Sequence, residues 1–412
     1  NRYQFALTDL STDTVSLTVP LDTGIKLYSY AYLDDSYTLS ELKNTAILAE
    51  QFGETNSFTI SSGDTSKEVS LKYFYAQMGG AIQGTELSLS TAVTTLAGTG
   101  SSGSANGTGT SASFKTIYGG ITTDGTNLYT AGYNSHLIRK IVIDNGTVTT
   151  LAGTGSSGSA NGTGTDASFV SPIGITTDGT NLYVVEYSGH RIRKIVISTG
   201  VVTTLAGTGS TGSANGTGTD ASFYNPLDIT TDGTNLYLAD GSNNLVRQIV
   251  IDNGTVTTLA GTGSSGSANG TGTAASFNRP WGITTDGTNL YVSEFNGHRI
   301  RKIVIDNGTV TTLAGTGSSG SANGTGTDAS FSGPMGITTD GTNIYAAEYS
   351  GHRIRKIVIS TGEVTTLAGS GSGGSTNGTG TDASFNRSGG VTTDGTNLYV
   401  SDTNNFLIRK VE

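Results

Sequence analysis

The 412-residue sequence contains no cysteine, only five prolines and few charged residues, 13% in all. Without cysteine, neither disulfide bonds nor thiolate metal sites can form. Acidic residues outnumber basic ones, 32 to 22, and no basic stripe is present, which argues against nucleic acid as a partner. No apolar run approaches the roughly 18 residues of a transmembrane helix, so we expect no direct membrane insertion. The expected partners are therefore a protein, a glycan or further copies of the chain.

Glycine is abundant, with 61 residues, and is accompanied by many Thr, Val, Ile and Tyr residues. This composition favours short β-strands joined by tight turns. A Gly-, Ser- and Thr-rich stretch that begins with LAG recurs along the chain and resembles a flexible linker. Its even spacing indicates a repeated structural unit instead. The leucine of this stretch recurs every 54 or 55 residues, at Leu96, Leu151, Leu205, Leu259, Leu313 and Leu367.

One repeat, residues 173–207, contains four β-rich runs: GITTD, NLYVVE, RIRKIVIS and VVTTLAG. Turn sequences such as DGTN and DNGT separate the first run from the second and the third from the fourth. Four strands in a repeat of this length are typical of one blade of a β-propeller.

The order of the strands predicts how the ring is built. The first type of strand occurs six times, at 120–124, 174–178, 228–232, 282–286, 336–340 and 390–394. The fourth type occurs first at 92–97, before any first strand, and the chain ends on a third strand at 406–412. We therefore predict an all-β fold, a six-bladed β-propeller whose ring is closed by strand 92–97 pairing with the last blade.

The runs NSHLIRK (134–140), YSGHRIRK (187–194) and FNGHRIRK (295–302) resemble NHL repeats, a family that forms six-bladed propellers. The flanking ASF and TDG-NLY patterns are similar to the bacterial branch of that family. The resemblance covers residues 92–412. The runs SNNLVRQ (242–248) and TNNFLIRK (403–410) depart from it, since they lack the histidine.

Four histidines occupy the same slot in four blades: His136, His190, His298 and His352. Related peptide-amidating lyases use histidines around a central metal, which leaves a lyase-type enzyme as one alternative. Equivalent slots lie far apart across a propeller, however, and zinc ligands must converge to about 2.0–2.1 Å. We therefore expect these histidines to pack in loops, and we predict no metal site, no cofactor and no catalytic residue.

An arginine in the third strand of each blade is expected to pair with an acid at the end of the second strand. Gly132 replaces the acid in the first repeat, which leaves Arg139 less well paired. The predicted structural ion pairs are Glu186–Arg193, Asp240–Arg247, Glu294–Arg301, Glu348–Arg355 and Asp402–Arg409.

Two further motifs each have two interpretations. The aspartates of the DGTN turns and of TDASF serve turn formation or bind calcium. The nine Asn-Gly-Thr sequences and Asn386-Arg-Ser form turns or accept N-linked glycans.

The segment that follows each ASF varies most between repeats and leads to the innermost strand, at the mouth of the central channel. Because strand directions alternate, this segment, the long loops and the histidine loops share one face. The variable side chains either bind a ligand at the channel mouth or fill the channel as a plug. The candidate ligand-binding residues are Lys115, Tyr118, Ile173, Tyr224, Leu227, Arg279, Trp281, Met335 and Arg387.

The first ninety residues differ in pattern. Alternating runs at 12–21, 25–35, 56–64 and 67–76 predict strands, and 38–53 predicts one short helix or an irregular segment. The pattern resembles Ig-like or transthyretin-like modules. We predict a β-sandwich at 1–78, a connector at 79–91 and the propeller at 92–412.

These observations favour a non-catalytic propeller, extracellular or on the cell surface, that binds a protein or glycan through its long-loop face. A self-assembling subunit of a surface layer or fibre is the first alternative, and the lyase-type enzyme is the second.

Overall fold

The computed structural model describes Thr14–Val15, Ile60–Ser61 and residues 86–412. The chain divides into two units, Asn1–Leu71 and Lys72–Glu412, and each is described by itself. In the first unit, β1 (Thr14–Val15) pairs antiparallel with β2 (Ile60–Ser61). These two strands lie inside the predicted strands 12–21 and 56–64. The rest of those runs, the predicted strands at 25–35 and 67–76 and the predicted helix at 38–53 lie outside the described residues.

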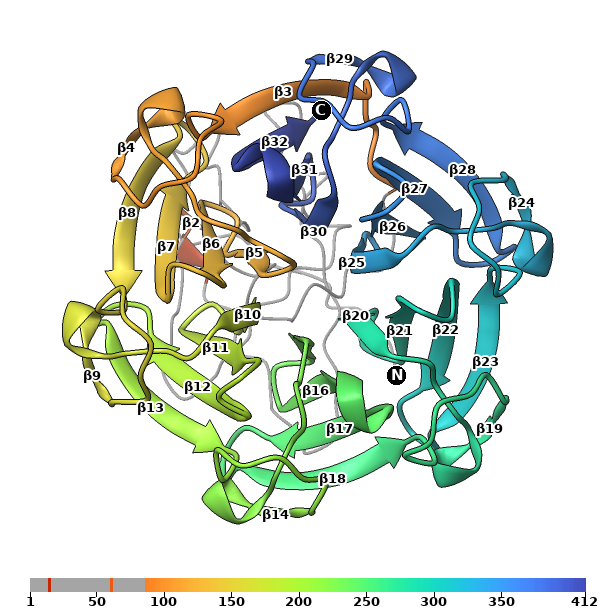
Figure 1. Ribbon diagram of the computed structural model, residues 1–412, viewed down its shortest axis with the longest axis horizontal. Helices are drawn as coiled ribbons and strands as arrows, with labels where there is room; N and C mark the ends of the chain where they lie inside the picture. Colours follow the sequence, from red (N-terminus) through yellow and green to blue (C-terminus); the bar gives the residue numbers. More distant parts are fainter. Residues whose placement is uncertain (1–13, 16–59, 62–85) are drawn as a thin grey trace. The chain divides into compact units, whose positions relative to one another are not determined.

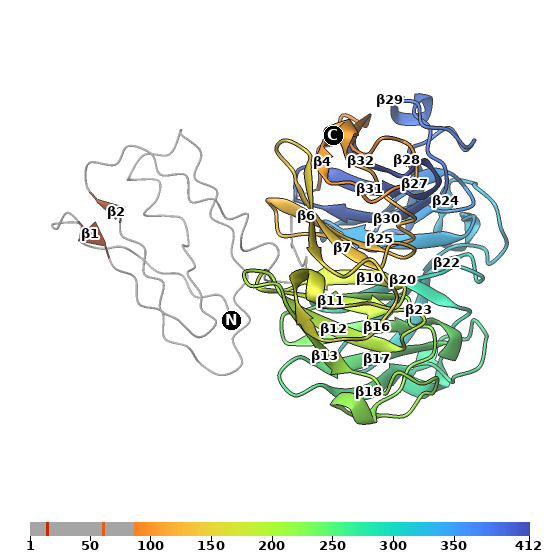
Figure 2. The same ribbon diagram turned by 60° about the vertical axis from the view of Figure 1, so that its left-hand side comes forward.

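The second unit is an all-β propeller of six five-stranded antiparallel sheets arranged around a central axis (Figure 1). The six-bladed fold expected from the repeats is thus confirmed. In blade 2 the strand order from the axis outward is β10-β11-β12-β13-β9, and the other blades have the equivalent order. Figure 2 shows the same strands from an oblique direction, with the blades side by side.

Strands that hold the same position in different blades are equivalent. The innermost strands are β5 (Ile121–Thr123), β10 (Pro172–Thr177), β15 (Asp228–Thr231), β20 (Pro280–Thr285), β25 (Pro334–Thr339) and β30 (Ser388–Thr393). The second strands are β6 (Asn127–Gly132), β11 (Asn181–Glu186), β16 (Asn235–Asp240), β21 (Asn289–Glu294), β26 (Asn343–Glu348) and β31 (Leu398–Asp402). The third strands are β7 (Leu137–Val142), β12 (Arg191–Val196), β17 (Leu245–Val250), β22 (Arg299–Val304), β27 (Arg353–Val358) and β32 (Leu407–Val411).

The fourth strands are β8 (Thr147–Ala152), β13 (Val201–Ala206), β18 (Thr255–Ala260), β23 (Thr309–Ala314), β28 (Glu363–Ala368) and, in blade 6, β3 (Ala92–Ala97). The short fifth strands are β4 (Gly107–Thr108), β9 (Gly162–Thr163), β14 (Gly216–Thr217), β19 (Gly270–Thr271), β24 (Gly324–Thr325) and β29 (Gly378–Thr379).

The fifth strand corrects the expectation of four strands per blade. The Gly/Ser/Thr-rich loop does not simply cross from one blade to the innermost strand of the next. It first lies along the outer edge of the next blade, where Gly162 and Thr163 pair with Val202 and Val201. Gly164 then takes a positive φ of 56° and donates its N–H to the Gly200 carbonyl at 2.9 Å. Glycine suits this left-handed backbone, so the loop is an ordered part of the blade.

The helices of residues 86–412 are all short 3-10 turns, and none of the described helices is long and apolar enough to cross a membrane. Six follow the fifth strands: η1 (Gly109–Ser111), η2 (Gly164–Asp166), η3 (Gly218–Asp220), η5 (Gly272–Ala274), η6 (Gly326–Asp328) and η7 (Gly380–Asp382). Two follow second strands: η4 (Gly241–Asn243) and η8 (Thr403–Asn405).

The apolar core lies between neighbouring blades. Tyr129 and Ile138 of blade 1, for example, belong to one buried cluster with Ile175, Leu182 and Val184 of blade 2. The inner strands are therefore buried on both faces, as in β10, whereas the outermost main strands alternate between buried and exposed positions. This packing fixes the angle between blades and so the width of the central channel.

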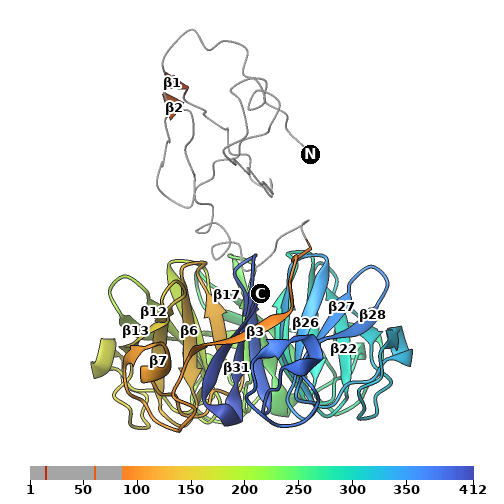
Figure 3. The ribbon, with the colours of Figure 1, turned by 90° about the horizontal axis from the view of Figure 1, so that it is seen from above.

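Blade 6 contains strands from both ends of the propeller sequence. Strand β3 pairs antiparallel with β32, with Val93 opposite Val411, and the sheet order is β29-β3-β32-β31-β30. In Figure 3, β3 (orange) lies beside the dark-blue strands that end the chain. Just before β3, Leu87 of the predicted connector is buried and donates its N–H to Asp340 Oδ2 at 3.1 Å.

Candidate functional site

Buried ion pairs hold the framework of the candidate site. In blade 2, Arg193 Nη1 lies 3.0 Å from Glu186 Oε1, and both side chains are fully buried. Four other blades have the same pair at 2.9–3.0 Å, so every predicted ion pair is present: Asp240–Arg247, Glu294–Arg301, Glu348–Arg355 and Asp402–Arg409. Burial raises the pKa of Glu186, and the Arg193 charge opposes that rise.

The same arginines fix the long loops. Arg193 donates to the carbonyls of Ser168 and Ala160 and to Asn161 Oδ1, at 2.8–3.0 Å. Its guanidinium also lies 5.2 Å from the centre of the Phe169 ring, a cation–π distance. Because Phe169 ends the ASF motif, this arginine positions the variable segment that follows it at the channel mouth.

The ion pair is built in two ways. In the Glu-containing blades a glycine adjoins the acid: a Cβ on Gly189 would lie 2.7 Å from Glu186 Oε2. In the Asp-containing blades an asparagine takes that glycine's place and reaches the shorter acid. Asn243 Nδ2 donates to Asp240 Oδ2 at 2.8 Å and to the Gly212 carbonyl at 2.7 Å.

Blade 1 lacks the acid, as the sequence indicates. Arg139 still donates to the carbonyls of Ser113 and Ala105 and to Asn106 Oδ1. No ion pair to Arg139 occurs within residues 86–412, and burial lowers the pKa of this guanidinium to about 10.

The histidines bridge neighbouring blades. Each has a left-handed backbone and accepts, at Nδ1, a hydrogen bond of 3.0–3.2 Å from an N–H of the next blade. His190, for example, accepts from Asn225, and Asn244 makes the equivalent bond to Arg279 through its Oδ1 at 3.0 Å. Loop packing therefore accounts for these histidines. Among the residues that the structure describes, no group of three or more His, Asp or Glu side chains could hold a metal.

The turn aspartates are engaged in turn contacts. Asp178 Oδ1 accepts the N–H groups of Thr180 and Asn181, and its Oδ2 accepts the Tyr183 hydroxyl at 2.8 Å. The equivalent tyrosine–aspartate bond occurs in each blade. Turn formation thus explains the DGTN aspartates, while the TDASF acids and the Asn-Gly-Thr sequences keep both of their interpretations.

An apolar plug fills the channel mouth. Ile173, Leu227 and Met335 are almost fully buried, Trp281 is 8% exposed, and all four belong to one cluster. A Cβ on Gly119 of blade 1 would lie 3.6 Å from the Trp281 Nε1 of blade 4, so the plug spans the channel. For these four candidate residues, burial favours the plug interpretation over direct ligand contact.

Above the plug lies an aromatic cluster that sequence reasoning found only in part. Its six rings form a continuous series with centroid separations of 5.1–6.3 Å, within the usual range for interacting rings. Apart from Trp281, the rings are half-buried, so each keeps an accessible edge or face. In spatial order the cluster is Tyr187, Tyr133, Tyr118, Tyr349, Phe295 and Trp281.

Four members of this cluster were not predicted from the sequence: Tyr133, Tyr187, Phe295 and Tyr349. A signal for them exists, because each directly follows the end of a second strand, where the repeats differ. Blades 3 and 6 have Gly241 and Thr403 at this slot. The aromatic cluster therefore comes from blades 1, 2, 4 and 5 alone.

Two of the candidate cations lie on the aromatic cluster. The Arg279 guanidinium lies 5.0 Å from the Trp281 ring centre and 5.5 Å from that of Phe295. Arg387 is exposed and lies 5.3 Å from the Tyr349 ring centre. The mouth thus combines aromatic faces with guanidinium donors.

The other two polar candidates lie elsewhere. Tyr224 is 42% exposed and packs beside His190 rather than in the cluster, with 6.1 Å between the two ring centroids. Lys115 is half-buried near His136, where burial first and the lysine charge second lower the pKa of the histidine.

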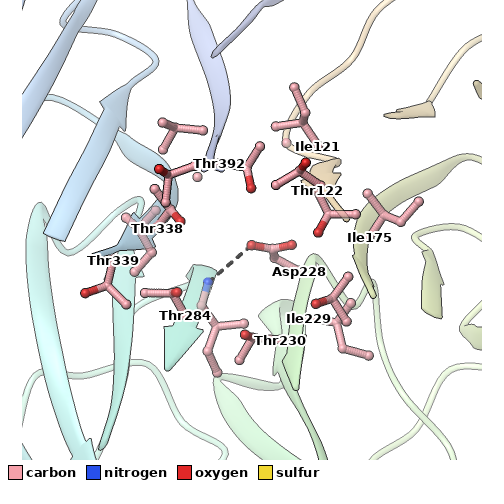
Figure 4. Close-up of a pocket in the computed structure, with 18 of the residues that line it drawn as sticks. Ile121, Thr122, Ile175, Asp228, Ile229, Thr230, Thr284, Thr338, Thr339 and Thr392 are labelled. Carbon is pink, nitrogen blue, oxygen red and sulfur yellow. Dashed lines mark hydrogen bonds between the residues drawn. The ribbon is translucent and has the colours of Figure 1, made fainter. Parts of the chain in front are cut away.

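Beneath the plug, the inner strands line a narrow channel with a cavity volume of about 70 Å³, enough for several water molecules. Figure 4 shows Asp228 pointing into this channel among threonines such as Thr122, Thr284 and Thr338. Asp228 ends the variable segment 224–228, but its carboxylate was not recognised as a candidate.

Comparison with known proteins supports the family resemblance. NHL repeat-containing protein 2 of Bos taurus is 27% identical over 317 residues, which cover 66% of this chain and 43% of that protein. Sequence and fold together support an NHL-type propeller. Protein SUPPRESSOR OF QUENCHING 1 of Arabidopsis thaliana is 29% identical over 283 residues, covering 64% of this chain and 27% of that protein. This chain therefore spans less than half the length of these curated relatives.

Among solved structures, an auxiliary nutrient binding protein from Bacteroides thetaiotaomicron resembles this chain with a TM-score of 0.57. The two are 18% identical, and the match covers 78% of this chain and 76% of that one. At this identity the likeness concerns the fold alone. No family model matches the sequence.

Proposed function

We propose that the protein is a non-catalytic binding protein, extracellular or on the cell surface, that binds a glycan or a protein segment at the channel mouth. The observation that carries this proposal is the continuous series of half-buried aromatic rings with two guanidinium groups beside it. Aromatic faces pack against the apolar faces of sugar rings or against apolar side chains, and guanidinium groups donate to hydroxyl, carbonyl or carboxylate oxygens. The similar fold of a nutrient binding protein is consistent with this role.

Only part of the cluster is available to a ligand. Trp281 is nearly buried in the plug, whereas Tyr349 and Arg387 lie at the surface of the same cluster. Arg387 Nη1 lies 3.4 Å from the Tyr349 hydroxyl, so the two side chains form one polar and aromatic contact point. We expect this pair to contribute most to binding.

A glycan and peptide array probed with the full chain would identify the ligand class. We expect Tyr349→Ala or Arg387→Ala to weaken binding at least tenfold, which corresponds to about 1.4 kcal/mol. Val201→Ala is the matched control, because Val201 is also exposed but lies on the outer strand β13. Equal binding by all three variants would refute the proposed site. Filaments or sheets of the purified protein in electron micrographs would instead support self-assembly.

We further propose that the β3–β32 pairing closes the ring and that the residues before it form a separate Ig-like β-sandwich. Hydrogen bonding between the first and last strands of the propeller supports the first point. The alternating pattern of residues 1–78 supports the second. The repeat motifs favour the bacterial type of NHL propeller.

A further inference from the structure

One inner strand carries a carboxylate where the equivalent strands have glycine. Asp228 occupies the slot of Gly120, Gly174, Gly282, Gly336 and Gly390. A side chain does not fit that slot in blade 4, since a Cβ on Gly282 would lie 2.2 Å from the Met335 carbonyl oxygen.

Blade 3 accommodates its side chain by a different strand register. Asp228 lies directly opposite Ala239, without the irregularity that separates Pro280 from Ile283 in blade 4. The regular register turns the Asp228 side chain to the channel side of β15, the same side as Thr230 two residues later. The presence of aspartate instead of glycine therefore comes with a local change in strand register. This change places a carboxylate in the channel.

Six threonine hydroxyls line the channel next to this carboxylate. They belong to the central threonine of each Ile/Val-Thr-Thr sequence, and none forms a protein hydrogen bond within residues 86–412. The neighbouring threonines differ, because Thr231, for example, donates its hydroxyl to the Asn235 carbonyl. The six channel threonines are Thr122, Thr176, Thr230, Thr284, Thr338 and Thr392.

The carboxylate itself is only partly neutralised. Asp228 Oδ2 accepts the N–H of Ile283 at 3.2 Å, and no lysine, arginine or histidine lines the channel in the described part of the chain. Asp228 is half-buried, and the space beside it is about 70 Å³, room for only several water molecules. A carboxylate with little water around it and no cationic partner is costly, so a positive charge supplied from solution would stabilise it.

We propose that the central channel binds one monovalent metal cation, such as Na⁺ or K⁺, between Asp228 and the threonine hydroxyls. A single carboxylate balances a single charge, and each hydroxyl can turn a lone pair to the cation. Calcium is a poorer fit, because it takes six to eight oxygen ligands and generally several carboxylates. This site is distinct from the aromatic cluster and independent of the ligand bound there.

Thermal unfolding of the full chain at pH 8 tests the proposal, with KCl, NaCl or N-methyl-D-glucamine chloride at equal ionic strength. The organic cation is too large for a cavity of about 70 Å³. We expect K⁺ or Na⁺ to raise the unfolding temperature by about 2 °C or more, with saturation. In Asp228→Asn, and in Asp228→Gly, which restores the residue of the other blades, the difference between salts should vanish.

Two further measurements make the outcome decisive. Crystals soaked in Tl⁺ should show an anomalous peak next to Asp228 in the wild type and none in Asp228→Asn. Burial inside the channel raises the pKa of Asp228 to about 7, so the salt effect should also disappear at pH 5, where the carboxyl is protonated. The same unfolding temperature in all three salts at pH 8, together with no anomalous peak, would overturn the proposal.

Discussion

The acid of the buried ion pair is glutamate in blades 2, 4 and 5 and aspartate in blades 3 and 6. Both kinds of blade bury an acid against the arginine of the third strand at 2.9–3.0 Å. In blade 4 the set is Glu294, Gly297 and His298; in blade 3 it is Asp240, Asn243 and Asn244. The longer acid needs a glycine beside it, whereas beside the shorter acid an asparagine donates to Asp240 Oδ2, the oxygen that also accepts from Arg247.

The comparison teaches that the repeat preserves an interaction rather than a residue. The acid and the residue three positions later change together, because the larger acid occupies the space that a glycine leaves. The histidine slot varies separately: Asn244 Oδ1 makes the inter-blade bond that histidine Nδ1 makes elsewhere, whereas blade 6 has Phe406 at this position. Blade 1 has Gly132 in place of the acid, so it naturally lacks this ion pair.

The largest effect should come from removing one partner of a buried pair. Glu294→Gln leaves the Arg301 charge buried without its counter-ion, and such a change typically destabilises a protein by about 3–5 kcal/mol. Urea unfolding monitored by circular dichroism would measure the loss. Glu412→Gln is the matched control, because the Lys410–Glu412 pair is exposed and worth well under about 1 kcal/mol.

A second set of variants sharpens the same comparison. Glu294→Asp alone shortens the acid and should lose most of this stability. Glu294→Asp with Gly297→Asn and His298→Asn converts blade 4 to the blade 3 set and should recover most of the loss. If the triple variant were no more stable than Glu294→Asp, the residues would not act as a set.

Much of the propeller could be predicted from the sequence because its repeats are nearly identical. Six copies of each strand motif average out local ambiguity, and the paired recurrence of Arg193-type and Glu186-type residues indicated the ion pairs. The fifth strands were missed because a two-residue segment such as Gly162–Thr163, within a glycine-rich stretch, is too short to show an alternating pattern. Their pairing depends on the turn of the following blade, which is a tertiary effect.

Residues of the candidate site could be predicted only in the segment after each ASF motif, where the repeats differ most. Trp281 and Tyr118 were found there, but their degree of burial follows from three-dimensional packing across the channel. Tyr133 and Tyr349 lie more than ten residues away in sequence and join the cluster only when the second strands converge at the mouth. Asp228 was overlooked because its significance depends on the glycines that occupy the same slot elsewhere.

Adding an acid to blade 1 should raise the stability of the protein moderately, in contrast to the loss expected for Glu294→Gln. Gly132→Glu with Ser135→Gly recreates the blade 2 set and gives Arg139 a partner. We expect a gain of about 1–3 kcal/mol in the free energy of unfolding, less than the loss for Glu294→Gln because the new acid must also be desolvated. Denaturant unfolding would measure it.

The single variants distinguish an ion pair from a general packing effect. A Cβ at residue 132 would lie 2.0 Å from the Ser135 Oγ, so Gly132→Glu alone should destabilise the protein. Ser135→Gly alone should change stability little. A double variant less stable than the wild type would show that blade 1 does not need the acid.

The smallest predicted effect is the pH dependence of the hydrogen bonds that the histidines make between blades. Burial lowers the pKa of His190 below its ordinary value of 6.5, and its Nδ1 accepts the Asn225 N–H. Because the folded state favours the neutral ring, the stability from this bond is complete above about pH 6.5. It is lost as the pH falls through the lowered pKa, since protonation of Nδ1 removes the acceptor.

His190→Asn separates this contribution from other titrating groups, because blade 3 already uses Asn244 at the same slot. We expect the variant to match the wild type at pH 7.5 and to exceed its stability by about 0.5–1 kcal/mol at pH 5. His190→Ala, which has no acceptor, should be less stable than the wild type at pH 7.5 and similar to it at pH 5. Identical pH profiles of the wild type and His190→Asn would mean that the His190 bond is not retained in solution, and the inter-blade role would then rest on packing alone.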